Sequence, residues 1–309
     1  MNDRGRAFWA TVAITAITPM VWGTTYFTTT QLLPDNRPLL AGTLRALPAG
    51  LLLAAIARRR PRGSWWWKSG VLGLLNIGAF FPLLFLAAYR LPGGVAAAVG
   101  AIQPLVAAAL AAVLLGERFR AVNLLTGLMG VAGVTLLVLR NEVPLDTLGV
   151  VAALGGALSM ASGVVLTKKW GRPVPLLAFT SWQLLAGGLV ILPVMLVVEG
   201  LPSELTSRNI AGYLWLSMIG CALAYSLWFR GIGKLPVAAT SVLALIAPIV
   251  AAVIGFVALD QTLTALQLLG VAVILASVAI TQWWAARRPS PAAAEAAPPV
   301  APVLVTSGR

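Results

Sequence analysis

Apolar residues fall into ten long stretches that are separated by short polar segments. Each stretch has about the 20 residues that a helix needs to cross a hydrocarbon layer of about 30 Å. The pattern predicts transmembrane helices over residues 9–30, 39–57, 69–89, 93–115, 122–139, 147–167, 175–198, 211–231, 237–258 and 265–285. Because the connections are short, we expect consecutive helices to be antiparallel neighbours.

Composition points to the same class of protein. Of the 309 residues, 59% are hydrophobic and 10% are charged, and the mean hydropathy is +0.91. Soluble domains carry about 25% charged residues, so the chain is predicted to be a polytopic membrane protein. The net charge of +13 would suggest a nucleic-acid partner in a soluble protein. Here the basic residues lie in short loops between apolar spans, so we expect no nucleic acid to bind.

One proline-containing segment occurs twice, at residues 91–117 and 235–261. With a constant offset of 144 residues, Pro92 aligns with Pro236 and Pro104 with Pro248. Proline removes a backbone donor and disturbs a helix, so these four residues are predicted helix breaks or hinges. The second proline of each pair lies about 18 Å along its helix, near the bilayer midplane. A broken helix at that depth must be buried in protein or line a cavity.

Ten helices and one internal repeat predict two units of five helices. Since five is odd, the second unit enters the membrane from the opposite side, as in the inverted repeats of secondary transporters. The predicted fold is an all-α integral membrane protein with ten transmembrane helices in two inverted five-helix repeats. Its predicted divisions are an N-terminal segment 1–8, a first repeat 9–140, a second repeat 147–286 and a disordered tail 287–309 rich in proline and alanine.

Basic residues are divided unevenly between the two ends of the predicted helices, and loops rich in Lys and Arg face the cytoplasm. One side holds 17 of the 22 Lys and Arg residues, namely Arg4, Arg6, Arg58, Arg59, Arg60, Arg62, Lys68, Arg118, Arg120, Lys168, Lys169, Arg172, Arg230, Lys234, Arg287, Arg288 and Arg309. The other side holds Arg37, Arg90, Arg140 and Arg208. This imbalance predicts that the N-terminal segment and the tail are both cytoplasmic.

Several kinds of chemistry lack the residues that they need. The chain has no histidine, and its single cysteine, Cys221, lies in an apolar span, so we expect no metal site and no internal disulfide. No nucleotide-binding P-loop motif is present, and we expect neither ATP nor any cofactor to be used. All nine acidic residues lie in loops or at span ends, whereas proton-coupled carriers usually hold a carboxylate or histidine at depth. Facilitated diffusion or exchange is therefore the expected mode of transport.

Several motifs resemble the drug/metabolite transporter superfamily, in particular its ten-helix EamA-type permeases. The first half carries Trp22 and Gly23, Arg45, the junction AAYRLPGG at 87–94 and the closing LLGER at 114–118. The second half repeats these in weaker form as GKLPVAAT at 233–240, Pro248 and ALDQT at 258–262. The likeness covers about residues 8–286, and within the family the chain is most similar to bacterial exporters of aromatic and neutral amino acids. It departs from the repeat where Glu117 becomes Gln261.

The resemblance implies a multi-pass protein of the bacterial inner membrane, with a substrate path in a central cavity between its halves. Its implied partners are a small-molecule substrate and the lipid bilayer. The expected oligomeric state is a monomer, and a dimer is the alternative.

Polar and aromatic residues deep in the spans are the predicted substrate-binding residues, because a small-molecule site is mostly apolar with a few polar groups. They are Trp22, Asn76, Phe80, Gln103, Ser159, Trp182, Gln183, Tyr225, Trp228 and Ser241. For the aromatic members, the alternative role is packing between helices. Gln103 directly precedes Pro104, so its amide either binds substrate or satisfies the backbone group that the proline frees.

Arg45 is the only charged residue clearly inside a predicted span. A charge in the membrane costs a few kcal/mol unless it is paired or solvated, and such residues are functional candidates. Arg45 is predicted to bind a substrate carboxylate, to face a water-filled cavity, or to snorkel to the outer interface about seven residues away.

These observations predict a secondary transporter that works by alternating access. Its expected substrates are small amphipathic metabolites, above all neutral and aromatic amino acids, which it exports or facilitates. The alternative is a permease of the same fold for drugs or sugar derivatives. An integral membrane enzyme is a remote alternative, because it would need a nucleophile, base or metal cluster at depth, and we expect no enzymatic activity.

Overall fold

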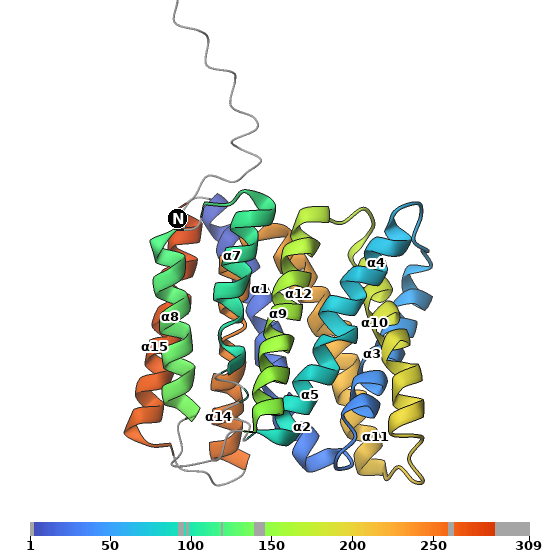
Figure 1. Cartoon of the computed structure of the whole chain (residues 1–309). Coiled ribbons are helices and arrows are strands. Elements are labelled where there is room, and N and C mark those ends of the chain that lie inside the picture. The colour runs from blue at the N-terminus through green and yellow to red at the C-terminus, as the bar shows by residue number, and fades with distance from the viewer. Residues whose placement is uncertain are drawn as a thin grey trace, which may run out of the picture.

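The computed structural model describes residues 3–91, 96, 99–118, 120–138, 146–258 and 263–287. Helices run roughly parallel to one another across the whole molecule (Figure 1). They are α1 (Asp3–Gly23), α2 (Thr25–Leu32), α3 (Pro38–Ala57), α4 (Trp65–Gly73), η1 (Leu74–Gly78), α5 (Phe80–Arg90), α7 (Gln103–Leu115), α8 (Ala121–Val138), α9 (Thr147–Trp170), α10 (Leu176–Val198), α11 (Ser207–Leu214), η2 (Trp215–Leu223), α12 (Ala224–Lys234), α13 (Val237–Leu243), α14 (Ile246–Ala258) and α15 (Ala265–Ala286).

Within the described residues, nine helical stretches are long and apolar enough to cross a membrane, and α7 is a shorter tenth. The nine long stretches overlap nine of the predicted spans, and α7 covers the second half of the remaining one, 93–115, of which residues 93–95 and 97–98 lie outside the described residues. The predicted all-α membrane fold is confirmed. Pro92, Arg140, Asp260 and Gln261 lie outside the described residues, as does the predicted tail after Arg287.

The two halves pack as inverted copies of each other. With the offset of 144 residues, α3 corresponds to α10 and α8 to α15, and each of these pairs is in direct contact. The contact of α1 with α12 has its counterpart in the contact of α5 with α9. In Figure 1 the chain enters α1 at the end of the molecule where α9 finishes, so the two halves begin at opposite ends.

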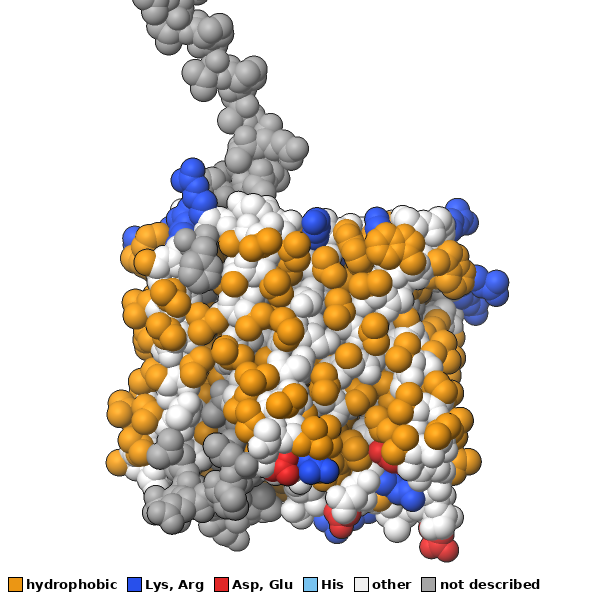
Figure 2. All heavy atoms as spheres, in the orientation of Figure 1, with side chains coloured by type: hydrophobic (Ala, Val, Ile, Leu, Met, Phe, Trp, Pro, Cys, Tyr) orange, Lys and Arg blue, Asp and Glu red, His pale blue; other side chains and the backbone are white. Residues whose placement is uncertain are grey.

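Charged side chains collect at the two ends, and apolar side chains form a broad band between them. In the view of Figure 2, one end carries Lys and Arg, whereas the other carries acidic side chains among a few basic ones. At the basic end, Lys168 donates hydrogen bonds to the carbonyls of Ile232, in the last turn of α12, and Leu235, its C-cap residue. At the other end, the Glu199 carboxylate accepts from the N–H groups of Leu39 and Leu40 at the start of α3. Both contacts follow the helix dipole, which favours cations at C-termini and anions at N-termini.

Two segments of π-helix lie at equivalent places in the two halves. Segment η1 covers 74–78 and η2 covers 215–223, and the offset of 144 carries the first into the second. A π-helical turn leaves backbone groups without their usual partners and is often found at functional sites. The hydroxyl of Ser159 donates to the carbonyl of Leu75 in η1 at 2.7 Å. Hydrophobic periodicity carries no signal for these segments, and the sequence did not predict them.

The first span is broken between α1 and α2, next to Gly23. A side chain at Gly23 would lie 2.6 Å from Cβ of Val250, so the close contact between α1 and α14 requires glycine. With the offset of 144 residues, this break corresponds to the C-terminal end of α9, which finishes at Trp170.

Candidate functional site

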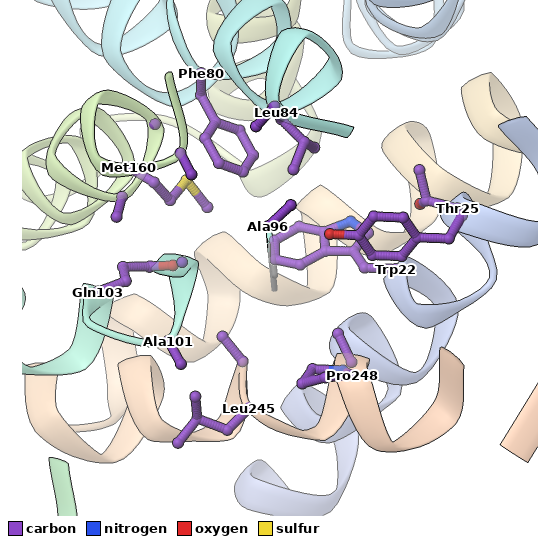
Figure 3. A pocket seen from close by; sticks show the side chains of 18 of the residues that line it. Trp22, Thr25, Phe80, Leu84, Ala96, Ala101, Gln103, Met160, Leu245 and Pro248 are labelled. Atoms are coloured by element: carbon purple, nitrogen blue, oxygen red, sulfur yellow. The ribbon is translucent and has the colours of Figure 1, made fainter. Parts of the chain in front are cut away.

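A cavity of about 150 Å³ lies at the centre of the molecule and is lined by both halves (Figure 3). The first half contributes residues of α1, α2, α3, α5 and α7, and the second contributes α9, α12 and the α13–α14 junction. The lining residues are Trp22, Thr25, Tyr26, Arg45, Phe80, Leu84, Ala87, Ala96, Gly100, Ala101, Gln103, Pro104, Ala153, Gly156, Ala157, Met160, Tyr225, Ala244, Leu245, Ala247 and Pro248. An apolar protein cavity of about this volume holds one benzene ring.

Aromatic side chains form one wall of the cavity. The rings of Trp22 and Tyr225 lie 5.1 Å apart and come from different halves. The indole nitrogen of Trp22 donates to the carbonyl of Gly220 at 3.1 Å, and the Tyr225 hydroxyl donates to the carbonyl of Asn76 at 3.3 Å. Both acceptors lie in the π-helical segments, so η2 and η1 hold the two rings in place. Phe80 lines the same cavity and lies across it from Trp22 in Figure 3.

The cavity also has two polar side chains that were singled out in the sequence. Arg45 is 2% exposed and lies over the ring of Phe81, with its guanidinium carbon 4.7 Å from the ring centre. It therefore lies in the interior and does not snorkel to the membrane surface. The buried Nε2 of Gln103 has no hydrogen-bond partner among the described residues. Gln103 was predicted either to bond to a freed backbone group or to bind a solute. The bond to a backbone carbonyl is not observed, and binding a solute remains a prediction.

Helix breaks in the two halves meet the same cavity. In the first half, residues 101–102 form a turn before α7 begins at Gln103, and Pro104 is the second residue of that helix. In the second half, residues 244–245 form a turn between α13 and α14, and Pro248 is the third residue of α14. A proline in the first turn of a helix leaves no hydrogen bond unmade. Pro236 precedes α13 as its N-cap residue.

Three of the sequence-predicted polar residues lie together outside the cavity. Nδ2 of Asn76 donates to Oε1 of Gln183 at 2.8 Å and to the hydroxyl of Thr167 at 3.4 Å. Ser159 is bonded to the neighbouring carbonyl of Leu75. These groups connect η1, α9 and α10, so they support the wall of the cavity from behind.

The remaining predicted residues are spread through the fold. Trp228 is fully buried behind Trp22, with ring centres 5.1 Å apart, and Ser241 is buried within α13. Trp182 lies at the basic end, where its indole donates to the carbonyl of Arg59 at 2.8 Å. It lines a second hollow of about 730 Å³ with Trp65 and the arginines of the α3–α4 loop. Three of the predicted substrate-binding residues, Trp182, Gln183 and Tyr225, therefore do not share one pocket, because Trp182 lies in this other hollow, Gln183 bonds to Asn76 and Tyr225 lines the central cavity.

Several cavity residues were not singled out in the sequence. Ala153, Gly156, Ala157 and Met160 lie on one face of α9 at helical spacing, and all four line the cavity. The small residues at i, i+3 and i+4 (Ala153, Gly156 and Ala157), followed by Met160 at i+7, were visible in the sequence, but the same spacing also describes ordinary helix packing. Thr25 and Tyr26 lie just past the break in the first span.

Among the described residues that line the cavity, the charged side chain is that of Arg45, which is positive. The acidic residues of the described chain lie at helix ends or in loops and are Asp3, Asp35, Glu117, Asp146, Glu199 and Glu204. Among the described residues, no three His, Cys, Asp or Glu side chains come together as a metal site would require. The arrangement of the described residues is suited to binding a small, largely apolar molecule.

Comparison with known proteins identifies the architecture. The sequence model of the EamA-like transporter family matches residues 9–139 and again residues 147–283. Protein PecM of Dickeya dadantii is 48% identical over 266 residues, which cover 85% of this chain and 89% of that protein. An uncharacterized transporter of Synechocystis, sll0355, is 30% identical, covering 86% and 88% of the two chains. The uncharacterized inner membrane transporter YedA of Escherichia coli K12 is 26% identical, covering 84% and 87%.

A solved crystal structure superposes on the chain with a TM-score of 0.76 and covers 91% of this chain and 99% of its own. At 22% sequence identity, this likeness concerns the fold alone. The two family matches account for the two repeats, and the expectation that the chain is a transporter and not an enzyme is confirmed. The chain is a multi-pass membrane protein and belongs to the EamA-like transporter family of secondary transporters.

Proposed function

We propose that this transporter exports small amphipathic metabolites, with neutral and aromatic amino acids as its substrates. The observation that carries the proposal is the central cavity, which is walled by Trp22, Phe80 and Tyr225 and has the volume of a single aromatic ring. A mostly apolar pocket with a few polar groups is the usual form of a small-molecule site. Its position between the halves is where inverted-repeat transporters bind their substrates.

The proposed mechanism is alternating access, in which the units 9–140 and 147–286 rock about the bound solute. The turns at 101–102 and 244–245, each followed by a proline, would act as the hinges because the helix hydrogen bonds are already interrupted there. We propose an uncoupled facilitator or exchanger, since the described acidic side chains lie at helix ends and in loops.

The proposed location is a bacterial inner membrane, because the relative YedA is described as an inner membrane transporter. The collection of Lys and Arg at one end of the molecule supports an orientation with both termini in the cytoplasm. A monomer is the proposed functional unit, because one chain contains both repeats and a complete cavity between them.

The proposal is tested by uptake into liposomes that contain the purified protein. Labelled tryptophan, phenylalanine and leucine are offered with and without an imposed pH gradient, and protein-free liposomes are the control. We expect saturable uptake that does not change with the gradient.

Two outcomes would contradict parts of the proposal. Uptake that follows the pH gradient would overturn the uncoupled mechanism and direct attention to Glu117 and Asp260. Absence of uptake for all three amino acids would overturn the substrate assignment, and drugs and sugar derivatives would be tested next.

A further inference from the structure

Arg45 carries a charge into the middle of the membrane-spanning bundle. It lies in α3, is 2% exposed and contacts the ring of Phe81. Arginine stays charged in proteins, so burial here does not remove the charge. A buried charge in a membrane protein is costly and is normally paired or bound to a ligand.

The described part of the chain provides no counter-ion for this charge. Neither Nε nor Nη1 of Arg45 has a hydrogen-bond partner among the described residues. The one ion pair in the described structure joins Arg90 to Asp146, at the ends of other helices. Around the guanidinium lie neutral groups, including the backbone of η2 at Gly220 and the thiol of Cys221. The contact with the ring of Phe81 attracts the guanidinium but does not neutralise its charge.

Arg45 lines the central cavity together with Gln103, whose buried amide nitrogen is also unpartnered. The cavity therefore has a cation and a second unused donor, whereas no described acidic residue lines it. A carboxylate offers only acceptors and can take two parallel hydrogen bonds from one guanidinium. A solute with an aromatic or apolar body and one carboxylate would place the body against Trp22 and Tyr225 and the anion on Arg45.

We propose that Arg45 is the anion-binding residue of the cavity and that transported solutes carry a carboxylate. This inference rests on the proposed function and makes it narrower. Amino acids are held through their carboxylates, monocarboxylates without an ammonium group bind at least as well, and cationic or uncharged analogues of the same shape bind poorly.

The test is ligand binding to the purified, detergent-solubilised protein, followed through the rise in its unfolding temperature. Two matched pairs of ligands are compared: indole-3-propionate with indole-3-propionamide, and tryptophan with tryptamine. In the wild type we expect each carboxylate to bind at least tenfold more tightly than its partner. In Arg45→Gln we expect this preference to disappear. In Arg45→Lys the charge is kept but the paired donors are lost, so we expect the preference to be reduced.

Arg37→Gln is the control variant, because Arg37 bonds to the carbonyls of Glu199 and Gly200 at the end of the bundle, outside the cavity. It should keep the full preference for carboxylates. If Arg45→Gln does not fold, the matched ligands on the wild type and on Arg45→Lys still decide the question. A purely structural arginine would change the unfolding temperature without ligand and leave the preference between matched ligands unaltered.

The inference is overturned if the wild type binds the amide and amine as tightly as the carboxylates, if Arg45→Gln keeps the preference, or if none of the four ligands binds. Transport is measured separately, so the two proposals can fail independently. Amino-acid uptake without a carboxylate preference would retain the proposed function and overturn the role of Arg45. A carboxylate preference in binding without amino-acid uptake would support Arg45 and overturn amino-acid transport.

Discussion

Asn76 donates a 2.8 Å hydrogen bond to Gln183 and so joins η1 of the first half to α10 of the second. Both side chains are fully buried, and neither lines the central cavity. Two polar residues that the sequence suggested for substrate are thus used to hold the halves together near the cavity. The pair is packed closely, because a side chain at Gly163 would collide with the Asn76 amide.

We expect Asn76→Ala to lower the free energy of unfolding by about 1 kcal/mol, the size of a hydrogen bond between membrane helices. The KM for uptake, measured in liposomes with equal protein content, should change little. A double-mutant cycle with Gln183→Ala, measured by unfolding in detergent, should give a coupling energy of about 0.6–1.7 kcal/mol. Purely additive effects of the two substitutions would contradict a direct bond between them.

Trp22→Ala should raise the KM for tryptophan uptake by about twofold to tenfold, because one aromatic contact contributes about 0.5–1.5 kcal/mol. The matched control is Trp182→Ala, since Trp182 lies in the second hollow, away from the cavity. Uptake by the two variants is compared in liposomes at equal protein content. A larger rise in KM for Trp182→Ala than for Trp22→Ala would place the substrate at the second hollow.

Pro248→Ala restores a backbone donor at the start of α14 and favours a continuous helix through the turn at 244–245. We expect turnover to fall about tenfold, which corresponds to about 1.4 kcal/mol on the conformational step. Pro193→Ala is the control, because Pro193 lies inside the uninterrupted helix α10. Equal turnover in Pro248→Ala and the wild type, or an equal loss in both variants, would contradict a hinge at this position.

The proposed orientation is tested by cysteine labelling. The wild-type chain should label little, because its only cysteine, Cys221, is fully buried. Lys169→Cys and Arg208→Cys introduce reactive groups at exposed positions in opposite end regions. With a membrane-impermeant maleimide added to intact cells, we expect labelling at position 208 and none at 169 until the cells are opened. The reverse pattern would invert the topology and the direction assigned to export.

Asp146 is the N-cap of α9, and it accepts a 2.7 Å hydrogen bond from the backbone N–H of Gly149. This bond, with a smaller contribution from Arg90, lowers the pKa of the Asp146 carboxyl below its usual range. A lowered folded-state pKa means that the carboxylate stabilises the fold at neutral pH and that this stability is lost as the pH falls through the lowered value.

Asp146→Ala should therefore unfold at a lower temperature than the wild type at pH 7, and the difference should shrink in acid. Thermal unfolding of both proteins, measured at several pH values between neutral and acidic, gives the difference in unfolding temperature and its change with pH. Asp35→Ala, in an exposed loop, is the control for a general effect of removing a carboxylate. A loss of stability for Asp146→Ala that stays constant at all pH values would rule out the titration of this cap.

The sequence alone determined the architecture because its signals are long and redundant. Twenty apolar residues in a row have few alternatives to a membrane span, and a proline pair repeated at a fixed offset reveals the duplication. The same repeat drew attention to Pro104 and Pro248, each of which lies shortly after a turn in the backbone, and their role as hinges stays a prediction. Of the ten residues predicted to bind substrate from their type and depth, Trp22, Phe80, Gln103 and Tyr225 line the cavity, and their binding of substrate stays a prediction.

Only the tertiary structure decided which deep polar side chains meet the cavity and which bond to each other. Asn76 and Gln183 are separated by 107 residues, and their pairing depends on how η1 crosses α10. Whether Arg45 snorkels or turns inward depends on the direction of one face of α3 against Phe81 and η2. Helix rotation and crossing follow from close packing with glycines such as Gly23, and a one-dimensional pattern of apolar residues that nearly surrounds each helix does not specify them.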